Sequence, residues 1–306
     1  MEQITTVRAL QARADAMRRA GRRIALVPTM GALHAGHLAL VDDARRRADF
    51  VVVSIFVNPA QFNSQTDLAA YPRPLEADLA ACKARGVDAV LLPNAQELYP
   101  AGYQTWIDVT ELAKPLCGGS RPGHFRGVAT VVAKLLIAAK PHVAVFGAKD
   151  YQQLALIRRL ARDLGLDVEI VGHATVREPD GLAMSSRNVH LTPETRVQAL
   201  ALSRALGAAQ RAIAAGERSR AALEALTASE IARAPLAKLD YAELRDPESL
   251  ELAPEHLTSS TLLALAVFFP KAGGDVVRLI DNAILHVQEA PRRAQRGEAE
   301  RSSKSG

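Results

Sequence analysis

The sequence predicts an α/β protein in which a doubly wound parallel sheet is followed by a second, smaller α+β domain packed over it. Two observations support this fold class. Over roughly the first 175 residues, short apolar runs alternate with helical patterns, and an Ala-rich helical stretch then precedes three strand-like segments. Strands that alternate with helices are typical of a parallel sheet covered by helices.

The first strand–helix–strand unit spans residues 24–57. Residues 24–27 read as a short buried strand closed by Pro28, and residues 37–48 carry apolar side chains at helical spacing. Residues 50–57 are an almost continuous apolar run that ends before Asn58, which fits a strand buried on both faces. The crossover between these two parallel strands is expected to be right-handed.

The alternation then continues through the rest of the first domain, which we assign to residues 1–175. The expected helices are 75–86, 125–139 and 150–164, and the expected strands are 88–92, 142–146 and 168–171. Ligands of doubly wound sheets bind at the carboxyl ends of the strands. The turns that follow these strands are therefore where a site is expected.

The second domain is assigned to residues 176–288. Residues 194–233 read as helical with a break near Gly216, and strands are expected at 239–245, 261–269 and 275–281. Residues 289–306 are polar and basic, which predicts a disordered tail.

Composition limits the function classes. Hydrophobic residues make up 48% and charged residues 23%, an ordinary globular balance. The formal net charge of +5 suits phosphorylated substrates, nucleic acid or an acidic membrane alike. The two cysteines, Cys82 and Cys117, are far apart, which argues against a disulfide scaffold. Residues 1–20 lack the apolar run of a signal peptide, and no segment reaches the length of a membrane span, so we expect a cytoplasmic protein without membrane contact.

The segment 28–37, Pro-Thr-Met-Gly-Ala-Leu-His-Ala-Gly-His, lies where a strand hands over to a helix. Unpaired backbone N–H groups and the helix dipole suit a phosphate chain there, and Gly31 and Gly36 allow the backbone to approach a ligand. His34 and His37 share one helix face. A neutral imidazole at this position still donates one hydrogen bond, which strengthens as negative charge builds on a phosphate. The alternatives are a zinc-binding pair or two surface histidines.

Two further segments follow other predicted strands of the first domain. Asn58 and Gln61 carry neutral amides that can hold a hydroxyl or a carboxylate without titrating, although Asn58 can equally cap a turn. In Gly-Ala-Lys-Asp, residues 147–150, Lys149 is a candidate cation for phosphates and Asp150 a candidate ribose ligand or helix cap. Gln152 or Gln153 can face the same cleft.

The fourth segment is Met-Ser-Ser-Arg-Asn at 184–188, which follows Asp180-Gly181 in a loop. Two hydroxyls and the guanidinium of Arg187 form a polydentate phosphate clamp. A capped turn is the alternative.

Together these segments resemble a known enzyme family. His-Ala-Gly-His resembles the His-x-Gly-His signature of the nucleotidyl-transferase superfamily, and Met-Ser-Ser-Arg resembles its mobile second phosphate motif. Six segments narrow the resemblance to pantothenate synthetases: Pro-Thr-Met-Gly-Ala-Leu-His at 28–34, Phe-Val-Asn-Pro-x-Gln-Phe at 56–62, Tyr-Pro-Arg at 71–73, Arg-Pro-Gly-His-Phe-Arg-Gly-Val at 121–128, Gly-x-Lys-Asp-Tyr-Gln-Gln at 147–153 and Leu-Ala-Met-Ser-Ser-Arg-Asn at 182–188. The order and spacing match from about residue 1 to 285.

The resemblance implies a Rossmann-like ATP domain, a smaller C-terminal lid domain, a homodimer and the use of Mg²⁺ with ATP. It also implies a reaction in two steps. The pantoate carboxylate attacks the α-phosphorus of ATP and releases pyrophosphate, and the β-alanine amine then attacks the pantoyl adenylate and releases AMP.

The resemblance also implies roles for particular residues. His37 is the implied proton donor, with His34, Lys149 and Arg187 as further catalytic residues. Asn58, Gln61 and Gln153 are expected to hold the substrates, and Asp78 is a candidate helper for Mg²⁺. The residues expected at ATP are Met30, Gly31, Ala32, Leu33, His34, Ala35, Gly36, His37, Gly147, Ala148, Lys149, Asp150, Val176, Met184, Ser185, Ser186 and Arg187.

The chain departs from the family pattern at Ala35 and Ala148, where many members carry Glu. We expect Ala148 to be compatible with full chemistry, because the backbone, Lys149 and Asp150 remain. Arg121 and His124 match a family motif, but the sequence does not show what they do.

Two other functions fit parts of the sequence. An adenylyl transferase for a phosphorylated cofactor precursor would carry extra Arg and Lys where this chain has Asn58, Gln61 and Gln153. An RNA-binding protein would show a basic stripe with stacking aromatics, but aromatic residues make up only 4% of the chain. We therefore expect small-molecule substrates and no nucleic acid.

Overall fold

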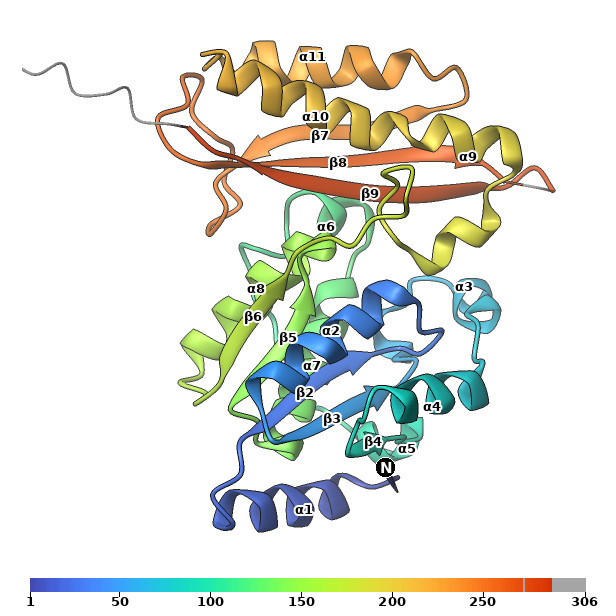
Figure 1. Cartoon of the computed structure of the whole chain (residues 1–306), viewed down its shortest axis with the longest axis vertical. Coiled ribbons are helices and arrows are strands. Elements are labelled where there is room, and N and C mark those ends of the chain that lie inside the picture. The colour runs from blue at the N-terminus through green and yellow to red at the C-terminus, as the bar shows by residue number, and fades with distance from the viewer. Residues whose placement is uncertain (272, 288–306) are drawn as a thin grey trace, which may run out of the picture.

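The computed structural model describes residues 1–271 and 273–287, which form two sheets, one above the other in Figure 1. The lower sheet has six strands in the order β1-β4-β3-β2-β5-β6, and every neighbouring pair is parallel. Its strands are β1 (Glu2–Ile4), β2 (Ile24–Thr29), β3 (Phe50–Ile55), β4 (Ala89–Leu91), β5 (Val143–Gly147) and β6 (Glu169–His173).

Helices cover both faces of this sheet because successive strand residues point to opposite sides. Ile24 and Leu26 of β2 belong to a core with α1 (Val7–Arg19), α7 (His124–Ala139) and α8 (Tyr151–Asp163). Ala25 and Val27 belong to a second core with α2 (Ala35–Arg47) and α4 (Leu75–Ala84). The alternating burial explains why the strands read as continuous apolar runs.

The chain reverses its direction across the sheet between β2 and β5. From β2 it proceeds through β3 to β4 on one side, and it later returns to β5 beside β2 and continues outward to β6. A crevice opens at such a switch point, outside the carboxyl ends of the strands. The short elements that line or flank this edge are η1 (Pro59–Gln61), α3 (Gln65–Ala70), α5 (Ala95–Leu98), α6 (Cys117–Ser120), η2 (Ala148–Asp150) and η3 (Ser186–His190).

The upper sheet is antiparallel, in the order β7-β8-β9. One of its faces packs under helices at the top of Figure 1, and the other faces the first domain. A small apolar cluster joins the two parts, with Leu262 and Ala264 of β8 packing against Leu112 and Ala155. Its elements are α9 (Pro193–Ala199), α10 (Ala201–Ala214), α11 (Arg220–Ala232), β7 (Lys238–Arg245), β8 (Thr261–Pro270) and β9 (Val276–Leu285).

The expected fold class, a doubly wound parallel sheet with a smaller α+β part, is confirmed. Several details differ from expectation. Residues 2–4 form an edge strand against β4 that the sequence did not predict, β2 continues through Pro28 to Thr29, and β9 extends to Leu285. The helical stretch 194–233 is divided near Leu200 as well as near Gly216. The domain limits of 1–175 and 176–288 stay a prediction, and the expected tail at 289–306 lies outside the described residues. Within the part that the structure describes, no helix is long and apolar enough to cross a membrane.

Candidate active site

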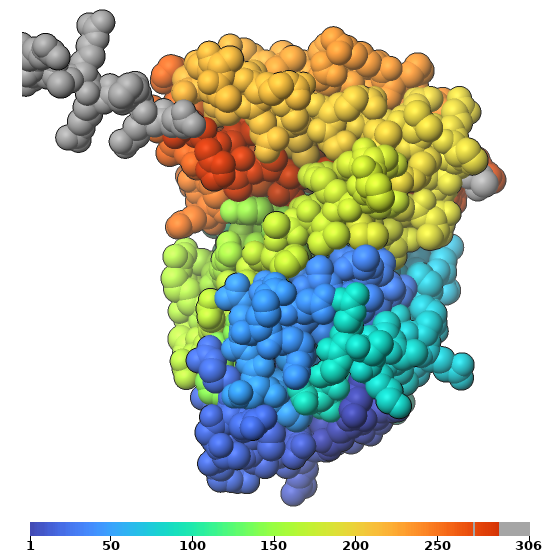
Figure 2. Space-filling view, viewed as in Figure 1, coloured from blue at the N-terminus to red at the C-terminus, as the bar shows by residue number. Residues whose placement is uncertain are grey.

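A cleft lies at the carboxyl ends of β2 and β5. Its walls come from the start of α2, the turn after β3, the turn after β5 and the segment that follows β6. In Figure 2 that last, yellow-green segment lies between the blue surface of the first domain and the yellow to red surface of the second domain above it. The cleft therefore has the first domain as its floor and residues 174–187 as part of its cover.

The turn that leads into α2 is held by a buried carboxylate. Asp78, 2% exposed, accepts hydrogen bonds from the backbone N–H groups of Ala32 at 2.9 Å and Leu33 at 2.7 Å. Gly31 has a φ of +82°, and a Cβ there would lie 2.9 Å from the Asp78 carboxylate, so both backbone and space require glycine. The bonds to Asp78 also hold Ala32 at its unusual φ of +50°. They fix the direction in which α2 begins.

His34 and His37 form a pair at the start of α2. Their ring centroids lie 4.0 Å apart. The backbone N–H of Gly36 donates to Nδ1 of His34 at 3.1 Å, and the N–H of His34 donates to Nδ1 of His37 at 3.3 Å. A Cβ on Gly36 would lie 2.8 Å from the His34 ring, so glycine is needed for the pair to sit this way.

Both rings favour the neutral form. Burial, followed by the neighbouring charge of His34 and with a smaller part from Lys149, lowers the pKa of His37 to about 3. Burial also lowers the pKa of His34, followed by the charge of Lys149. Because each Nδ1 accepts a hydrogen bond, the hydrogen-bond pattern assigns the single ring proton to Nε2. At neutral pH the pair therefore offers Nε2–H donors, not imidazolium cations.

The amides after β3 are organised by protein contacts. Asn58, 1% exposed, donates from Nδ2 to Gln61 Oε1 at 3.0 Å and to the Gly127 carbonyl at 3.1 Å. Its Oδ1 accepts from the Tyr99 hydroxyl at 2.9 Å and from the N–H of Ala60 at 3.3 Å. All four hydrogen-bonding positions of the Asn58 amide are thus used within the protein. The structure gives Asn58 the role of orienting Gln61, and direct contact of Asn58 with substrate stays a prediction.

Arg121 and His124 support the same turn. His124 Nδ1 donates to the backbone carbonyl of Gln61 at 2.8 Å, and a guanidinium nitrogen of Arg121 lies 3.0 Å from His124 Nε2. Burial, followed by the charge of Arg121, lowers the pKa of His124 to about 4, which fits a neutral ring with its proton on Nδ1. The sequence did not show this role, because it depends on a contact between residues 63 positions apart.

The cleft carries excess positive charge. Arg121, Lys149 and Arg187 line it together with the carboxylate of Asp150. Within residues 1–271 and 273–287, neither Lys149 nor Arg187 has a salt-bridge partner within 4.0 Å. Unpaired cations beside a helix N-terminus suit a polyanionic ligand.

The structure brings most of the predicted site residues to one cleft. Its lining includes Met30, His34, Gly36, His37, Asn58, Gln61, Gly147, Lys149, Asp150, Gln153, Val176, Met184, Ser185, Ser186 and Arg187. Other predicted residues lie beside it without lining it, namely Gly31, Ala32, Leu33, Ala35, Ala148 and Asp78. The roles assigned to all of these residues stay predictions.

Sequence reasoning missed the apolar wall of the cleft and one polar residue. Four side chains of α7 form that wall: Val128, Val131, Val132 and Leu135. They read as ordinary core positions, so no sequence signal marked them. Tyr71 also lines the cleft, and in the sequence only its place in the Tyr-Pro-Arg segment marks it. Gln152, in contrast, is tied to the 112–117 segment, which leaves Gln153 as the glutamine that lines the cleft.

The residues present do not form a protein-built metal cage. No group of three or more His, Cys, Asp or Glu side chains is placed to hold a metal among the residues described. Both oxygens of Asp78 already accept backbone hydrogen bonds. This donor set fits an ion that brings most of its oxygen ligands with it, as Mg²⁺ does on the phosphates of a nucleotide.

Comparison with known proteins decides the family. The family model described as "Pantoate-beta-alanine ligase" matches residues 2–284. The chain belongs to the pantoate–β-alanine ligase family. Among curated members of this family, the chain is similar to the pantothenate synthetase of Syntrophobacter fumaroxidans, with 54% identity over 93% of the chain and 99% of that protein. It is also similar to the pantothenate synthetase of Geobacter sulfurreducens, with 52% identity over the same shares of both chains.

Solved structures of the family agree with the fold. The crystal structure of pantothenate synthetase from Thermus thermophilus matches with a TM-score of 0.86 and 44% identity, over 94% of this chain and all of that one. The pantoate–β-alanine ligase of Francisella tularensis, solved as a complex with β-γ ATP and β-alanine, matches with a TM-score of 0.72 and 34% identity, over 93% of this chain and 97% of that one.

Proposed function

We propose that this chain condenses pantoate with β-alanine at the expense of ATP, through a pantoyl adenylate, and is a pantoate–β-alanine ligase. The observation that carries the proposal is the family match over residues 2–284, a range that includes every residue lining the cleft. The cleft combines a helix N-terminus, two neutral histidines, unpaired cations and buried amides at one switch point.

In the first step, a carboxylate oxygen of pantoate attacks the α-phosphorus of ATP. The bond from the α-phosphorus to the bridging oxygen breaks, and pyrophosphate leaves with the bonding electrons. Charge rises on the phosphoryl oxygens, and preorganised donors stabilise it. We assign this role to the Nε2–H groups of His34 and His37 and to the cations of Lys149 and Arg187.

In the second step, the amine of β-alanine attacks the acyl carbon of the adenylate. The bond from that carbon to the phosphate-linked oxygen breaks, AMP leaves, and the amine loses a proton. Neither step needs a protein nucleophile. The contribution of the protein is to place two substrates in line, which we assign to Gln61, Gln153 and the turn held by Asn58.

Three further points belong to the same proposal. We propose that Mg²⁺ enters on the phosphates of ATP, where it neutralises charge, because the described residues offer no cage of their own. We propose that residues 184–187 and the second domain act as a lid that keeps water from the acyl adenylate. We also propose a cytoplasmic homodimer, as the family resemblance implies.

The decisive experiment supplies ATP, pantoate and β-alanine and measures AMP and pantothenate. With pantoate alone, labelled pyrophosphate should exchange into ATP, because the first step is reversible without β-alanine. Exchange that strictly required β-alanine would contradict a separate adenylation step. Product formation only from a phosphorylated precursor would favour the alternative adenylyl transferase.

A matched pair of variants tests the assigned cation. Lys149→Met should lower pyrophosphate exchange by roughly a hundredfold or more, because a charge that stabilises the transition state is lost. Lys83→Met removes an exposed lysine on α4 and should leave exchange unchanged. Equal activity in the two variants would remove Lys149 from the mechanism.

A further inference from the structure

Lys149 leaves a turn that lacks its own cap. The η2 turn, Ala148–Asp150, follows Gly147 and has no side-chain cap hydrogen bond at its start. Helix α8 begins directly after it, and Asp150 at the helix start also makes no side-chain cap bond. No side chain of the turn itself therefore caps it, which leaves a role for contacts that reach the turn from other segments.

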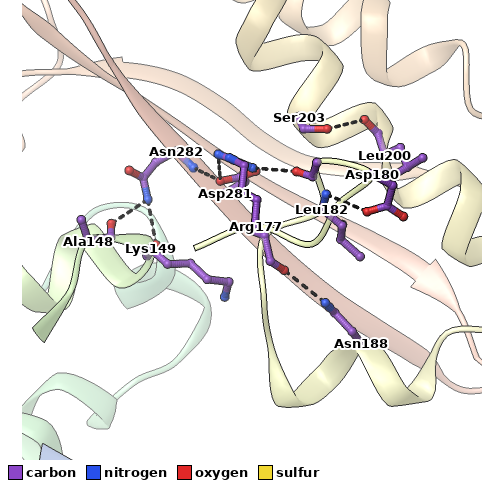
Figure 3. Close-up of polar contacts among 12 residues, drawn as sticks. Ala148, Lys149, Arg177, Asp180, Leu182, Asn188, Leu200, Ser203, Asp281 and Asn282 are labelled. Atoms are coloured by element: carbon purple, nitrogen blue, oxygen red, sulfur yellow. Dashed lines mark hydrogen bonds and ion pairs between the residues drawn. The ribbon is translucent and has the colours of Figure 1, made fainter. Parts of the chain in front are cut away.

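One such contact comes from the second domain. Nδ2 of Asn282, on strand β9, donates to the carbonyl of Lys149 at 2.7 Å and to the carbonyl of Ala148 at 3.0 Å. Figure 3 shows the Asn282 amide above these two carbonyls, with the Lys149 side chain extending from the same turn. One amide group thus uses both of its N–H bonds on the backbone of the turn.

Asp281, the residue before Asn282 on β9, holds the hairpin that precedes Arg187. Asp281, 2% exposed, forms a bidentate ion pair with Arg177 at 2.7 Å and 3.0 Å. Arg177 also donates to the Gly181 carbonyl at 3.1 Å, which ties together the two sides of the 176–184 hairpin. The N–H of Met184 closes this hairpin by donating to the Val176 carbonyl at 2.9 Å. The phosphate-clamp residues 185–187 follow immediately.

Asp281 and Asn282 are coupled to each other. The backbone N–H of Asn282 donates to Asp281 Oδ1 at 2.9 Å. They sit on a strand that is paired with β8 along its length, so their separation and direction are fixed by the sheet. Two segments that are far apart in the sequence, the Lys149 turn and the hairpin before Arg187, are therefore attached to adjacent residues of one rigid strand.

We propose that Asp281 and Asn282 form a bracket on β9 that sets the placement of Lys149 relative to Arg187, with Asn282 as a positioning residue for Lys149. This inference rests on the proposed function, because it assigns to both cations a role on the phosphates of ATP. Asn282 touches no reacting group and acts only through the turn. Its contribution belongs to the adenylation step, in which charge develops on phosphorus.

The test compares two replacements of Asn282 with a control in the same domain. Asn282→Asp keeps the side-chain shape but cannot donate to the carbonyls, and Asn282→Ala removes both shape and donors. Ser219→Ala is the control, because it removes the cap of α11, whose Oγ accepts from Ala222 at 3.2 Å, at a position that does not line the cleft. Loss of that cap destabilises the second domain without touching the turn.

Adenylation, measured as pyrophosphate exchange with pantoate, should fall by about tenfold to a hundredfold in both Asn282 variants, because a displacement of about 1 Å at a reacting centre costs this much. Pantothenate formation from added pantoyl adenylate and β-alanine should stay within about twofold of the parent. Ser219→Ala should leave both rates unchanged. In a Lys149→Met background, Asn282→Ala should lower the residual exchange by less than about twofold, since it acts through Lys149.

Three results would overturn the inference. They are parent-like exchange in both Asn282 variants, an equal loss in the two half-reactions, and full additivity with Lys149→Met. Hydrogen exchange at residues 148–152 gives a readout without substrates, and unchanged protection in Asn282→Ala would show that the amide does not hold the turn. If the unmodified protein exchanges no pyrophosphate, both the proposed function and the catalytic part of the inference are overturned. If the unmodified protein exchanges pyrophosphate and the Asn282 variants do so equally fast, only the inference is overturned.

Discussion

Replacing His37 should reduce, by a calculable amount, the loss of unfolding free energy that this protein suffers as the pH falls. Burial lowers the pKa of His37 to about 3, whereas an unfolded histidine titrates near 6.5. Between these two values the unfolded chain binds a proton that the folded chain excludes. Stability is therefore unaffected by this group above about pH 6.5, and it is lost progressively as the pH falls from about 6.5 towards about 3.

The magnitude at pH 5 can be worked out from these two pKa values. At that pH the unfolded histidine is almost fully protonated and the folded one almost fully neutral. The difference of about 1.5 pH units below 6.5 corresponds to about 2 kcal/mol of lost unfolding free energy relative to pH 8. Such a loss is a sizeable share of the stability of an ordinary domain.

The assay is urea unfolding of the substrate-free protein at pH 8 and pH 5, for the parent and for His37→Asn. The parent should lose about 2 kcal/mol more between the two conditions than the variant, because asparagine does not titrate. His256→Asn, which replaces an exposed histidine, is the matched control and should show the parent's loss. The reasoning is refuted if His37→Asn loses as much stability as the parent, because the ring would then protonate equally in both states.

Other substitutions test the histidine pair, the Lys149 turn and the packing of α7. His37→Ala, and similarly His34→Ala, should lower kcat by roughly 10²–10⁴-fold with little change in the far-UV circular dichroism spectrum, and near-normal turnover would exclude these rings from the mechanism. Ala148→Glu should change pyrophosphate exchange by less than about tenfold, because position 148 does not line the cleft; a larger gain would show that this position takes part. Gly127→Ala should destabilise the protein by roughly 1–3 kcal/mol in thermal unfolding, because the new Cβ would lie 2.3 Å from the Ala60 carbonyl oxygen, and an unchanged melting temperature would contradict that packing.

The sequence predicts the central elements of the fold well, because their signals are local. β2, β3 and β5 are largely apolar runs, and the helices between them repeat apolar residues at helical spacing. The edge strand β1 could not be predicted, since only Ile4 of its three residues is buried and its pairing partner β4 is distant in the chain. Strand assignment there depends on tertiary contact, not on local pattern.

The candidate site likewise has a part that the sequence predicts and a part that it does not. Glycines and histidines after a strand, or Lys149 before a helix, are visible as motifs because the chemistry requires those residue types at that spacing. What a motif does not show is which side chains are satisfied by the protein itself. That depends on contacts between residues far apart in the sequence. Examples are the hydrogen bonds that Asn58 and Asp78 make within the protein, the bond from His124 to the Gln61 carbonyl, and the bond from Asn282 to the Lys149 carbonyl.

The hydrogen bonds that the two histidine rings accept from backbone N–H groups also affect whether these rings can bind a trace metal. A transition ion needs a free lone pair on an imidazole nitrogen. In His34 and His37 the Nδ1 lone pair is engaged by a backbone N–H, and Nε2 carries the proton. To chelate an ion through Nε2, each ring would have to lose its proton or move it to Nδ1. A proton on Nδ1 would point at the backbone N–H that now donates to that atom, and the hydrogen bonds that cap α2 would be lost. As they are placed here, neither histidine presents a free ring-nitrogen lone pair with which zinc or copper could be chelated.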